Sequence, residues 1–372
     1  MISLVLDNQK AMNSIDKDGM LQAVESLPIQ LKESFLITEK ANLNINKTFD
    51  SILFFGLGGS GIVGNLVEAT AKDDIEIPLM VHKKSSLPNW VSSKTLCFAI
   101  SYSGDTKETC ENFKDALTKQ ATLISISSGG RLKILSQESN TPFIELPRGF
   151  PPRAAIGFLA TSALLTLEKL GLIQISNSIN ETIVLLEEKK AEYNLRIAFE
   201  KNLAKQIAVR LKDKIPVIYA CEDSELVSAL RWKCQLNENS KIPAFANFFP
   251  ELTHNEIVGW NGPAGDKFAI LALKNADLKR ENLVLFDKAL QIISANVSDV
   301  IEVAVQGQSH LARIFSLIQL ADFVSTYLAI LNNINPMPIE KINALKQAVA
   351  NAENARGLTA KSNEVQLADS EK

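Results

Sequence analysis

The sequence predicts an α/β protein with two doubly wound parallel sheets, each flanked by helices. Short uncharged runs, typical of strands buried on both faces, alternate with stretches of helical length and periodicity. This alternation occurs twice, over residues 49–172 and again over residues 213–350. Strands that alternate with helices indicate a parallel sheet covered on both faces. A content of 46% hydrophobic and 22% charged residues is typical of a globular protein.

The first unit begins with an uncharged strand at residues 51–55, four glycines and a helix that continues over residues 62–71. A helix that starts on glycines presents free backbone N–H groups and the positive end of its dipole, so this stretch predicts an anion site, usually for phosphate. Ser60 adds a hydroxyl at the same place. Further elements are expected as strands at 77–81, 95–100, 121–125 and 142–146, and as an apolar helix at 153–170.

The remaining elements follow the same patterns. Residues 1–48 are expected to form a helical arm, with a helix over 18–39, and residues 173–212 a charged, solvated helical linker. In the second unit we expect strands at 215–220, 268–273 and 297–303, and helices at 226–238, 283–294, 309–332 and 339–350. The polar tail at 351–372 is expected to be disordered.

Composition excludes several classes of protein. A net charge of −3 argues against nucleic-acid binding. No apolar run of membrane-spanning length and no signal peptide are expected, which favours a cytoplasmic protein. The four cysteines form no C-x-x-C pair, and the three histidines show no metal-binding spacing, so no metal site is expected. These residues are Cys97, Cys110, Cys221, Cys234, His82, His254 and His310.

The glycines at 56–61 satisfy the pattern G-x-G-x-x-G, which is typical of dinucleotide-binding sites. That interpretation requires an acidic residue about 20 positions later to bind the ribose. Residues 80–84 read Met-Val-His-Lys-Lys and contain no carboxylate. The missing partner makes a dinucleotide site the weaker hypothesis.

A second turn of the same kind follows the strand at 95–100. Ser101, Ser103 and Thr106 place three hydroxyls beside Gly104 where a helix begins. Such a turn alone is most often a helix cap. Two such turns at strand carboxyl ends can converge on one ligand, because open α/β sheets bind ligands at that edge. Both turns are poor in Lys and Arg, which suits a monophosphate bound by neutral donors.

Together the two turns resemble the sugar isomerase (SIS) domain. Later segments narrow the resemblance to the bifunctional phosphoglucose/phosphomannose isomerases of archaea and some bacteria. It covers residues 49–350, and the long segment around His254 is specific. The segments are residues 152–155 (Pro-Arg-Ala-Ala), 237–241 (Asn-Glu-Asn-Ser-Lys), 251–260 (Glu-Leu-Thr-His-Asn-Glu-Ile-Val-Gly-Trp), 336–339 (Pro-x-Pro-Ile) and 345–346 (Leu-Lys).

This resemblance implies two SIS-type domains in a homodimer that interconverts glucose 6-phosphate, and mannose 6-phosphate, with fructose 6-phosphate through a cis-enediol, without a cofactor. Glu238 matches the base, and Arg153 the arginine that steadies the enediolate. His254 matches the histidine that opens the pyranose ring at the active site of the partner subunit. Lys346 matches the lysine that assists ring opening, with Lys341 as a rival. The implied phosphate-binding residues are Gly59, Ser60, Ser101, Ser103 and Thr106.

The residue types fit this chemistry independently of the family resemblance. Moving a carbonyl between C1 and C2 needs a base for the proton and a cation or donors for the enediolate. Glu238 is expected at a helix C-terminus, where the helix dipole disfavours a carboxylate. A solvated surface glutamate is the alternative, and Glu256 is the next candidate for the base.

One position departs from the family pattern. The family often reads Asp-Pro-Thr-Pro where this sequence has Asn-Pro-Met-Pro at 335–338. A small hydroxyl residue there would leave room for both sugar epimers, so Met337 weakens the expectation of mannose 6-phosphate activity. Two other functions stay open. A sugar-phosphate sensor without turnover would need only the hydroxyls of the first unit, and a nicotinamide-dependent dehydrogenase would use the glycine motif.

Overall fold

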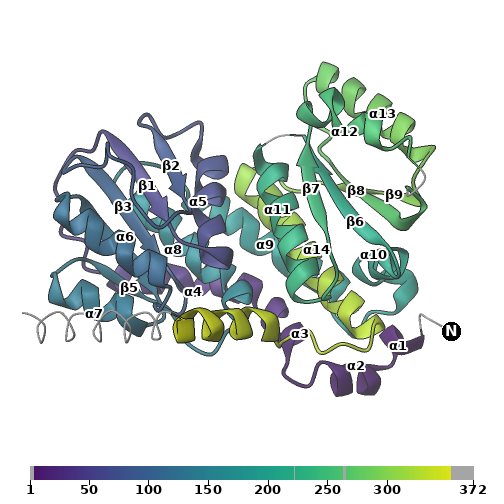
Figure 1. Ribbon diagram of the computed structural model, residues 1–372, viewed down its shortest axis with the longest axis horizontal. Helices are drawn as coiled ribbons and strands as arrows, with labels where there is room; N and C mark the ends of the chain where they lie inside the picture. Colours follow the sequence, from purple (N-terminus) through teal and green to yellow (C-terminus); the bar gives the residue numbers. More distant parts are fainter. Residues whose placement is uncertain (1–3, 222, 263–264, 353–372) are drawn as a thin grey trace, which may run out of the picture. The chain divides into compact units, whose positions relative to one another are not determined.

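The computed structural model describes residues 4–221, 223–262 and 265–352 (Figure 1). Residues 4–336 belong to one compact unit that contains both sheets. The described residues from Met337 onward belong to a second compact unit, which is not the second α/β repeat of the sequence analysis, and residues 340–352 within it are helical. The tail predicted to be disordered lies outside the described residues from position 353 onward.

The N-terminal arm consists of four helices rather than one long helix. Asp16 ends the second and caps the third, since its carboxylate accepts hydrogen bonds from the N–H groups of Met20 and Leu21 at 2.8 and 2.7 Å. Pro28 stands in the first turn of the fourth, where its missing N–H costs nothing. The helices are α1 (Leu4–Asp7), α2 (Gln9–Ile15), α3 (Met20–Glu25) and α4 (Leu27–Lys40).

The first sheet has five parallel strands in the order β2-β1-β3-β4-β5. The predicted bounds of β1 and β3 are confirmed, and β2 begins two residues later than predicted, after Pro78, which has no N–H for the ladder. The strands are β1 (Ser51–Phe55), β2 (Leu79–His82), β3 (Thr95–Ile100), β4 (Thr122–Ser127) and β5 (Phe143–Glu145).

Side chains of alternating position face opposite sides of this sheet. Phe54 packs with α5 and α8 on one side and stacks on Phe98 at 4.4 Å between ring centroids. Phe55 faces α6 and α7 on the other side. Helices therefore cover both faces, which confirms the predicted doubly wound fold (Figure 1). The helices are α5 (Gly58–Ala71), α6 (Lys107–Thr118), α7 (Gly130–Glu138) and α8 (Ile156–Lys169).

The second sheet has four parallel strands in the order β7-β6-β8-β9. Its edge strand β7 was not predicted, because Phe-Ala-Asn-Phe is short, half exposed and lacks β-branched residues. The elements are β6 (Ile215–Ala220), α11 (Asp223–Glu238), β7 (Phe245–Phe248), η4 (Gly265–Lys267), β8 (Phe268–Lys274), α13 (Arg280–Ser294), β9 (Asp299–Ala304) and α14 (His310–Leu331).

Helix α14 is the centre of the second half of the chain. By length and composition alone it is apolar enough to cross a membrane, although Arg313, Gln319 and Asp322 interrupt its apolar run. However, 94% of its most apolar window is buried inside the protein, as in the core helix of a globular fold.

The predicted linker is packed against α14. It consists of α9 (Ser176–Tyr193), η2 (Phe199–Lys201) and α10 (Leu203–Leu211), and it buries residues such as Leu186, Ala204 and Leu211. The division of the chain into five parts stays a prediction.

Gly104 illustrates how tightly the turns after the strands pack. Its φ is +76°, and a Cβ there would lie 1.9 Å from the carbonyl oxygen of Gly129. We expect Gly104→Ala to lower the free energy of unfolding by at least about 2 kcal/mol, through left-handed strain plus the clash. Gly171→Ala is the matched control, because φ is +74° but no atom lies within 4 Å. Urea unfolding followed by circular dichroism should show the larger loss for Gly104→Ala, and equal losses would contradict the packing argument.

Candidate active site

The carboxyl ends of β1 and β3 form the topological switch point of the first sheet. The chain leaves β1 toward one face and β3 toward the other, and open α/β sheets bind ligands at such a point. The turn after β1 leads into α5, and the turn after β3 leads into α6. The structure therefore brings together the two turns in which the sequence predicts phosphate binding.

Hydrogen bonds join and order these turns. The buried Ser60 hydroxyl accepts a hydrogen bond from the N–H of Tyr102 at 3.0 Å, which links the first turn to the second. Ser101 and Thr106 share a hydroxyl–hydroxyl hydrogen bond of 3.0 Å, and Ser101 also accepts from the N–H of Gly104 at 3.1 Å. Ser103 is exposed. The donors are thus held in place before any ligand arrives, which reduces the entropy lost on binding.

Arg153 lies directly against the first turn, on the short helix η1 (Pro152–Ala154). A Cβ at Gly59 would lie 3.4 Å from the Arg153 Cα and from the Pro152 carbonyl oxygen, at the short limit of ordinary contact, so the glycine turn and η1 lie close together. The arm helix α4 supports η1 from behind, because Gln30 Nε2 donates to the Ala154 carbonyl at 2.7 Å. The predicted long helix at 153–170 is therefore interrupted after Ala154, and α8 begins at Ile156.

The Arg153 guanidinium reaches the second half of the chain. It is 2% exposed and donates to Asn239 Oδ1 at 2.6 Å and to the Pro336 carbonyl at 2.9 Å. Its Nη1 lies 3.8 Å from Glu238 Oε2, and the Glu238 side chain is 27% exposed. Burial lowers the pKa of Arg153, and the Glu238 carboxylate opposes that shift. The predicted base and the predicted cation are therefore neighbours.

Glu238 is the last residue of α11, as the sequence predicts. Lys241 Nζ donates to its backbone carbonyl and, at 2.9 Å, to the carbonyl of Pro336. Lys241 thus covers the negative end of the helix, where the carboxylate is otherwise disfavoured. Its left-handed φ of +60° belongs to the turn that ends the helix.

A buried ion pair supports this arrangement and was not predicted. Arg231 donates to the backbone carbonyl of Arg153 and lies 3.1 Å from Asp322 Oδ1, and both side chains are 2% exposed. Gln235 Nε2 donates to Asp322 at 2.6 Å. Burial raises the pKa of Asp322, and Arg231 opposes that rise. Only a signal such as a lone Asp inside the apolar helix α14 could have pointed to this contact.

His254 ends the helix η3 (Glu251–His254) and is exposed. The loop around it is anchored by Glu256, the first residue of α12 (Glu256–Gly259). The Glu256 carboxylate accepts hydrogen bonds from the Tyr219 hydroxyl and, at 2.5 Å, from Asn247 Nδ2. Trp260 Nε1 donates to the Tyr219 hydroxyl at 2.8 Å. Burial raises the pKa of Tyr219, so it stays a donor. Glu256 is thus occupied in the fold, which disfavours it as the base.

Two lysines and one histidine remain among the candidates. Lys346 and Lys341 belong to the helix of residues 340–352, in the second compact unit, and their roles stay predictions. His310 opens α14, with Nε2 3.3 Å from Asp73 Oδ2. Among the residues that the structure describes, no three His, Cys, Asp or Glu side chains gather as a metal site would require.

Comparison with known proteins places these features in a family. Residues 47–141 match the SIS domain, and residues 200–349 match the bacterial phospho-glucose isomerase C-terminal SIS domain. The bifunctional phosphoglucose/phosphomannose isomerase of Caldicellulosiruptor bescii is 39% identical over 335 residues, 89% of this chain and 99% of the relative. That of Aquifex aeolicus is 33% identical, over 80% of this chain and 90% of the relative. The chain belongs to the bifunctional phosphoglucose/phosphomannose isomerase family.

Solved structures confirm the fold of this family member. A glucose-6-phosphate isomerase like protein from Thermus thermophilus aligns over 92% of this chain and 98% of its own, with a TM-score of 0.62 and 16% identity. The C-terminal domain of glucosamine-fructose-6-phosphate aminotransferase from Francisella tularensis aligns over 86% and 98%, with a TM-score of 0.66 and 19% identity. At these identities the likeness concerns the fold alone.

The buried ion pair gives a prediction about stability. We expect Asp322→Ala to lower the free energy of unfolding by about 3–5 kcal/mol, because it leaves the Arg231 charge buried without compensation. The control Asp73→Ala removes an exposed carboxylate and should change stability by less than about 1 kcal/mol. Urea unfolding of both variants is the measurement.

The double variant Arg231→Met/Asp322→Leu tests the same point from the other side. It removes both charges, so it should regain part of the stability lost in Asp322→Ala. A double variant less stable than Asp322→Ala would show that the charge pair itself is not what matters.

Proposed function

We propose that this protein interconverts glucose 6-phosphate, and also mannose 6-phosphate, with fructose 6-phosphate. One observation carries the proposal: the carboxylate of Glu238 and the guanidinium of Arg153 lie 3.8 Å apart, beside the two phosphate-type turns. A base next to a fixed cation is what proton transfer through an enediolate needs. Membership of the isomerase family supports the same reaction.

The turns after β1 and β3 would bind the substrate phosphate. The N-terminus of α5 supplies backbone N–H groups around Gly59, and the hydroxyls of Ser60, Ser101, Ser103 and Thr106 supply neutral donors. Gly59 lies close to the backbone of Arg153, so a phosphate on the turn would hold the sugar near the residue that carries the guanidinium. The phosphate thus fixes the end of the sugar chain and leaves C1 and C2 for the chemistry.

Glu238 would act on the open-chain sugar. Its carboxylate takes the proton from C2 of the aldose, the C2–H electron pair forms the C1–C2 double bond of a cis-enediolate, and the proton returns to C1 as the C2 carbonyl forms. Arg153 holds the negative charge on the oxygen atoms meanwhile. The proton returns to the neighbouring carbon, so the reaction consumes no oxidant or reductant.

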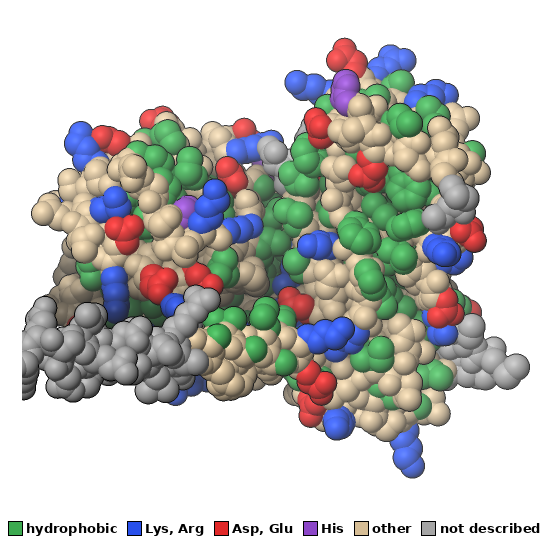
Figure 2. All heavy atoms as spheres, viewed as in Figure 1, with side chains coloured by type: hydrophobic (Ala, Val, Ile, Leu, Met, Phe, Trp, Pro, Cys, Tyr) green, Lys and Arg blue, Asp and Glu red, His purple; other side chains and the backbone are tan. Residues whose placement is uncertain are grey.

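His254 would open the pyranose ring of a substrate bound to the partner subunit in a homodimer. Two features support such an interface. Hydrophobic side chains gather on the face where β7 lies (Figure 2), and Phe245, Phe248 and Val258 are 53%, 39% and 69% exposed. The edge strand β7 also leaves one side of the second sheet unpaired within the described residues. A second copy of the chain covering this edge would bring His254 with it.

Lys346, with Lys341 as its rival, would assist ring opening. Met337 occupies the position where the family often has threonine, and its longer side chain would leave less room at C2 for the mannose epimer. We also place the enzyme in the cytoplasm, since no disulfide joins the four cysteines and reduced thiols are typical of a reducing compartment. A relative from Sulfolobus acidocaldarius, 29% identical, is a D-glucosamine-6-phosphate 4-epimerase, so assays should include amino sugars.

The proton transfer predicts a specific defect. Glu238→Gln keeps the shape of the side chain and removes the base, so kcat should fall by roughly two to four orders of magnitude. Substrate carrying deuterium at C2 should exchange it with solvent in the unchanged enzyme and keep it in the variant. Thermal unfolding should show that the variant is folded. Isomerisation at a near-normal rate would mean that another residue is the base.

The phosphate site predicts a loss of substrate binding. Ser103 is exposed and its hydroxyl is not needed to join the turns, so Ser103→Ala should leave the fold intact while weakening binding of fructose 6-phosphate about fivefold or more. Unphosphorylated glucose should not be turned over by either protein. Steady-state kinetics measure both effects, and an unchanged KM and kcat would remove Ser103 from the site.

The shared site predicts complementation between two inactive variants. Glu238→Gln and His254→Asn subunits, mixed and refolded together, form dimers in which one site has both an intact Glu238 and an intact His254. Activity should then recover to about a quarter of the normal value, for random pairing of subunits. Each variant alone is the control. Mixtures as inactive as the separate variants would contradict donation of His254 across the interface.

A further inference from the structure

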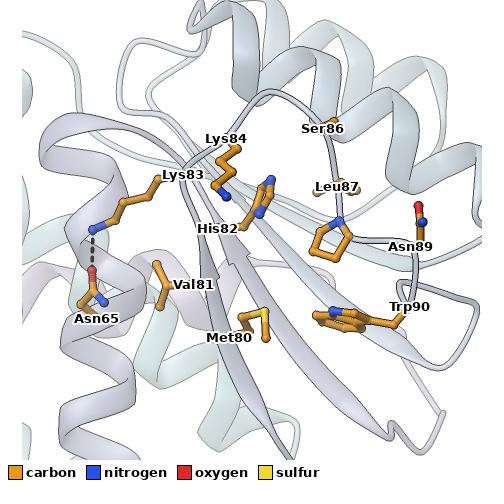
Figure 3. A pocket seen from close by; sticks show the side chains of 11 residues that line it. Asn65, Met80, Val81, His82, Lys83, Lys84, Ser86, Leu87, Asn89 and Trp90 are labelled. Carbon is orange, nitrogen blue, oxygen red and sulfur yellow. Dashed lines mark hydrogen bonds between the residues drawn. The ribbon is translucent and has the colours of Figure 1, made fainter.

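A cavity of about 780 Å³ opens at the carboxyl end of β2, outside the candidate active site (Figure 3). Its walls come from the end of β2, from the loop that follows and from α5. This size falls in the range of small-molecule sites. None of the residues assigned to the phosphate turns or to the Glu238–Arg153 pair lines it. The lining residues are Asn65, Met80, Val81, His82, Lys83, Lys84, Ser86, Leu87, Pro88, Asn89 and Trp90.

The wall of this cavity carries positive charge and no carboxylate. Lys83 and Lys84 are consecutive at the end of β2, and neither Asp nor Glu occurs among the lining residues. Lys83 Nζ donates to Asn65 Oδ1 at 2.6 Å, which fixes that ammonium against α5. Lys84 forms no ion pair within the described part of the chain. A dinucleotide site would need an acidic residue at this position to bind the ribose. Lysines stand there instead, and their positive charge favours an anion.

His82 adds an unsatisfied polar atom to this wall. The residue is only 8% exposed, and its Nε2 is buried without a hydrogen-bond partner among the described residues. A buried polar nitrogen without a partner is destabilising, so a small rotation of the imidazole toward the cavity, where an anionic ligand could accept a hydrogen bond from it, would relieve that cost. Figure 3 shows the imidazole standing at the end of β2 beside the cavity.

The opposite end of the cavity is flat and apolar. Trp90 is 42% exposed and Met80 46% exposed, and Leu87 and Pro88 also line the cavity. An exposed indole at a pocket is a platform on which a planar ring can stack. The cavity thus offers a cationic end and an aromatic end within one ligand-sized volume.

We propose that this cavity binds a nucleoside monophosphate, with its phosphate at His82, Lys83 and Lys84 and its base on Trp90. The site is distinct from the site of turnover, and the proposal does not depend on the isomerase reaction. Asn65 and Ser60 both belong to α5, five residues apart, so an occupied cavity would act on the helix that starts at the phosphate turn.

Trp90 provides the probe for a direct test. The other two tryptophans, Trp232 and Trp260, are 0% and 9% exposed, so a ligand that quenches tryptophan fluorescence at low concentration acts through Trp90. Titration with AMP should quench the emission saturably, and Trp90→Phe should abolish the signal. Adenosine and ribose 5-phosphate each carry half of the proposed ligand and should bind at least about tenfold more weakly.

Calorimetry of variants separates the pocket from its surroundings. Lys84→Met and His82→Ala should each weaken AMP binding about tenfold or more. Lys94→Met is the matched control, because Lys94 is exposed and pairs with Asp50 just ahead of β1 and β3, away from the carboxyl ends of the strands. Ser103→Ala should leave AMP binding unchanged, since it alters only the candidate phosphate turn.

Three outcomes would overturn the proposal. The first is the absence of saturable quenching by AMP. The second is AMP binding that survives in Lys84→Met and His82→Ala. The third is competition of fructose 6-phosphate with AMP together with a loss of AMP binding in Ser103→Ala, which would make the cavity part of the substrate site.

Discussion

The structure depends on the pairing of one buried cation, Arg153. A guanidinium that is 2% exposed is tolerated only when its charge and its donors are matched. Glu238, Asn239 and the Pro336 carbonyl meet it from the second half of the chain, whereas its backbone stands against the glycine turn of the first. Docking of the two halves and assembly of the candidate site are therefore one event.

The support of Arg153 comes from groups that have no place in the chemistry. Arg231 holds its backbone carbonyl, Asp322 neutralises Arg231, and Gln30 fixes the next residue of the turn. Buried networks of this kind are costly when incomplete, so they impose a single arrangement. That rigidity suits a site that must position a proton acceptor within hydrogen-bonding distance of a carbon atom.

Environment also separates the two glutamates that the sequence offered as a base. Glu256 has one oxygen bonded to Tyr219 and the other to Asn247, and it anchors the loop that exposes His254. Glu238 is partly exposed beside a cation, and none of the described residues anchors its carboxylate in the same way. Two different environments also lie at the carboxyl end of the first sheet. The turns after β1 and β3 carry neutral hydrogen-bond donors, whereas the end of β2 carries Lys83, Lys84 and, in the loop that follows, Trp90 around a separate cavity.

The sequence alone determined the repeated α/β pattern, the bounds of the most apolar strands and the two glycine-serine turns, because these features rest on local periodicity and on what glycine permits. Residues 51–55, 95–100 and 215–220 are strands as predicted. The sequence could not reveal β7, because the pairing of β7 with β6 comes from tertiary contact rather than from strand propensity. Nor could it reveal the packed state of residues 176–211 or the Arg231–Asp322 pair, because neither depends on neighbours in the sequence. Only the folded chain decided that Arg153 and Glu238, 85 positions apart, lie 3.8 Å from each other, since burial of one charge requires the other groups to meet it.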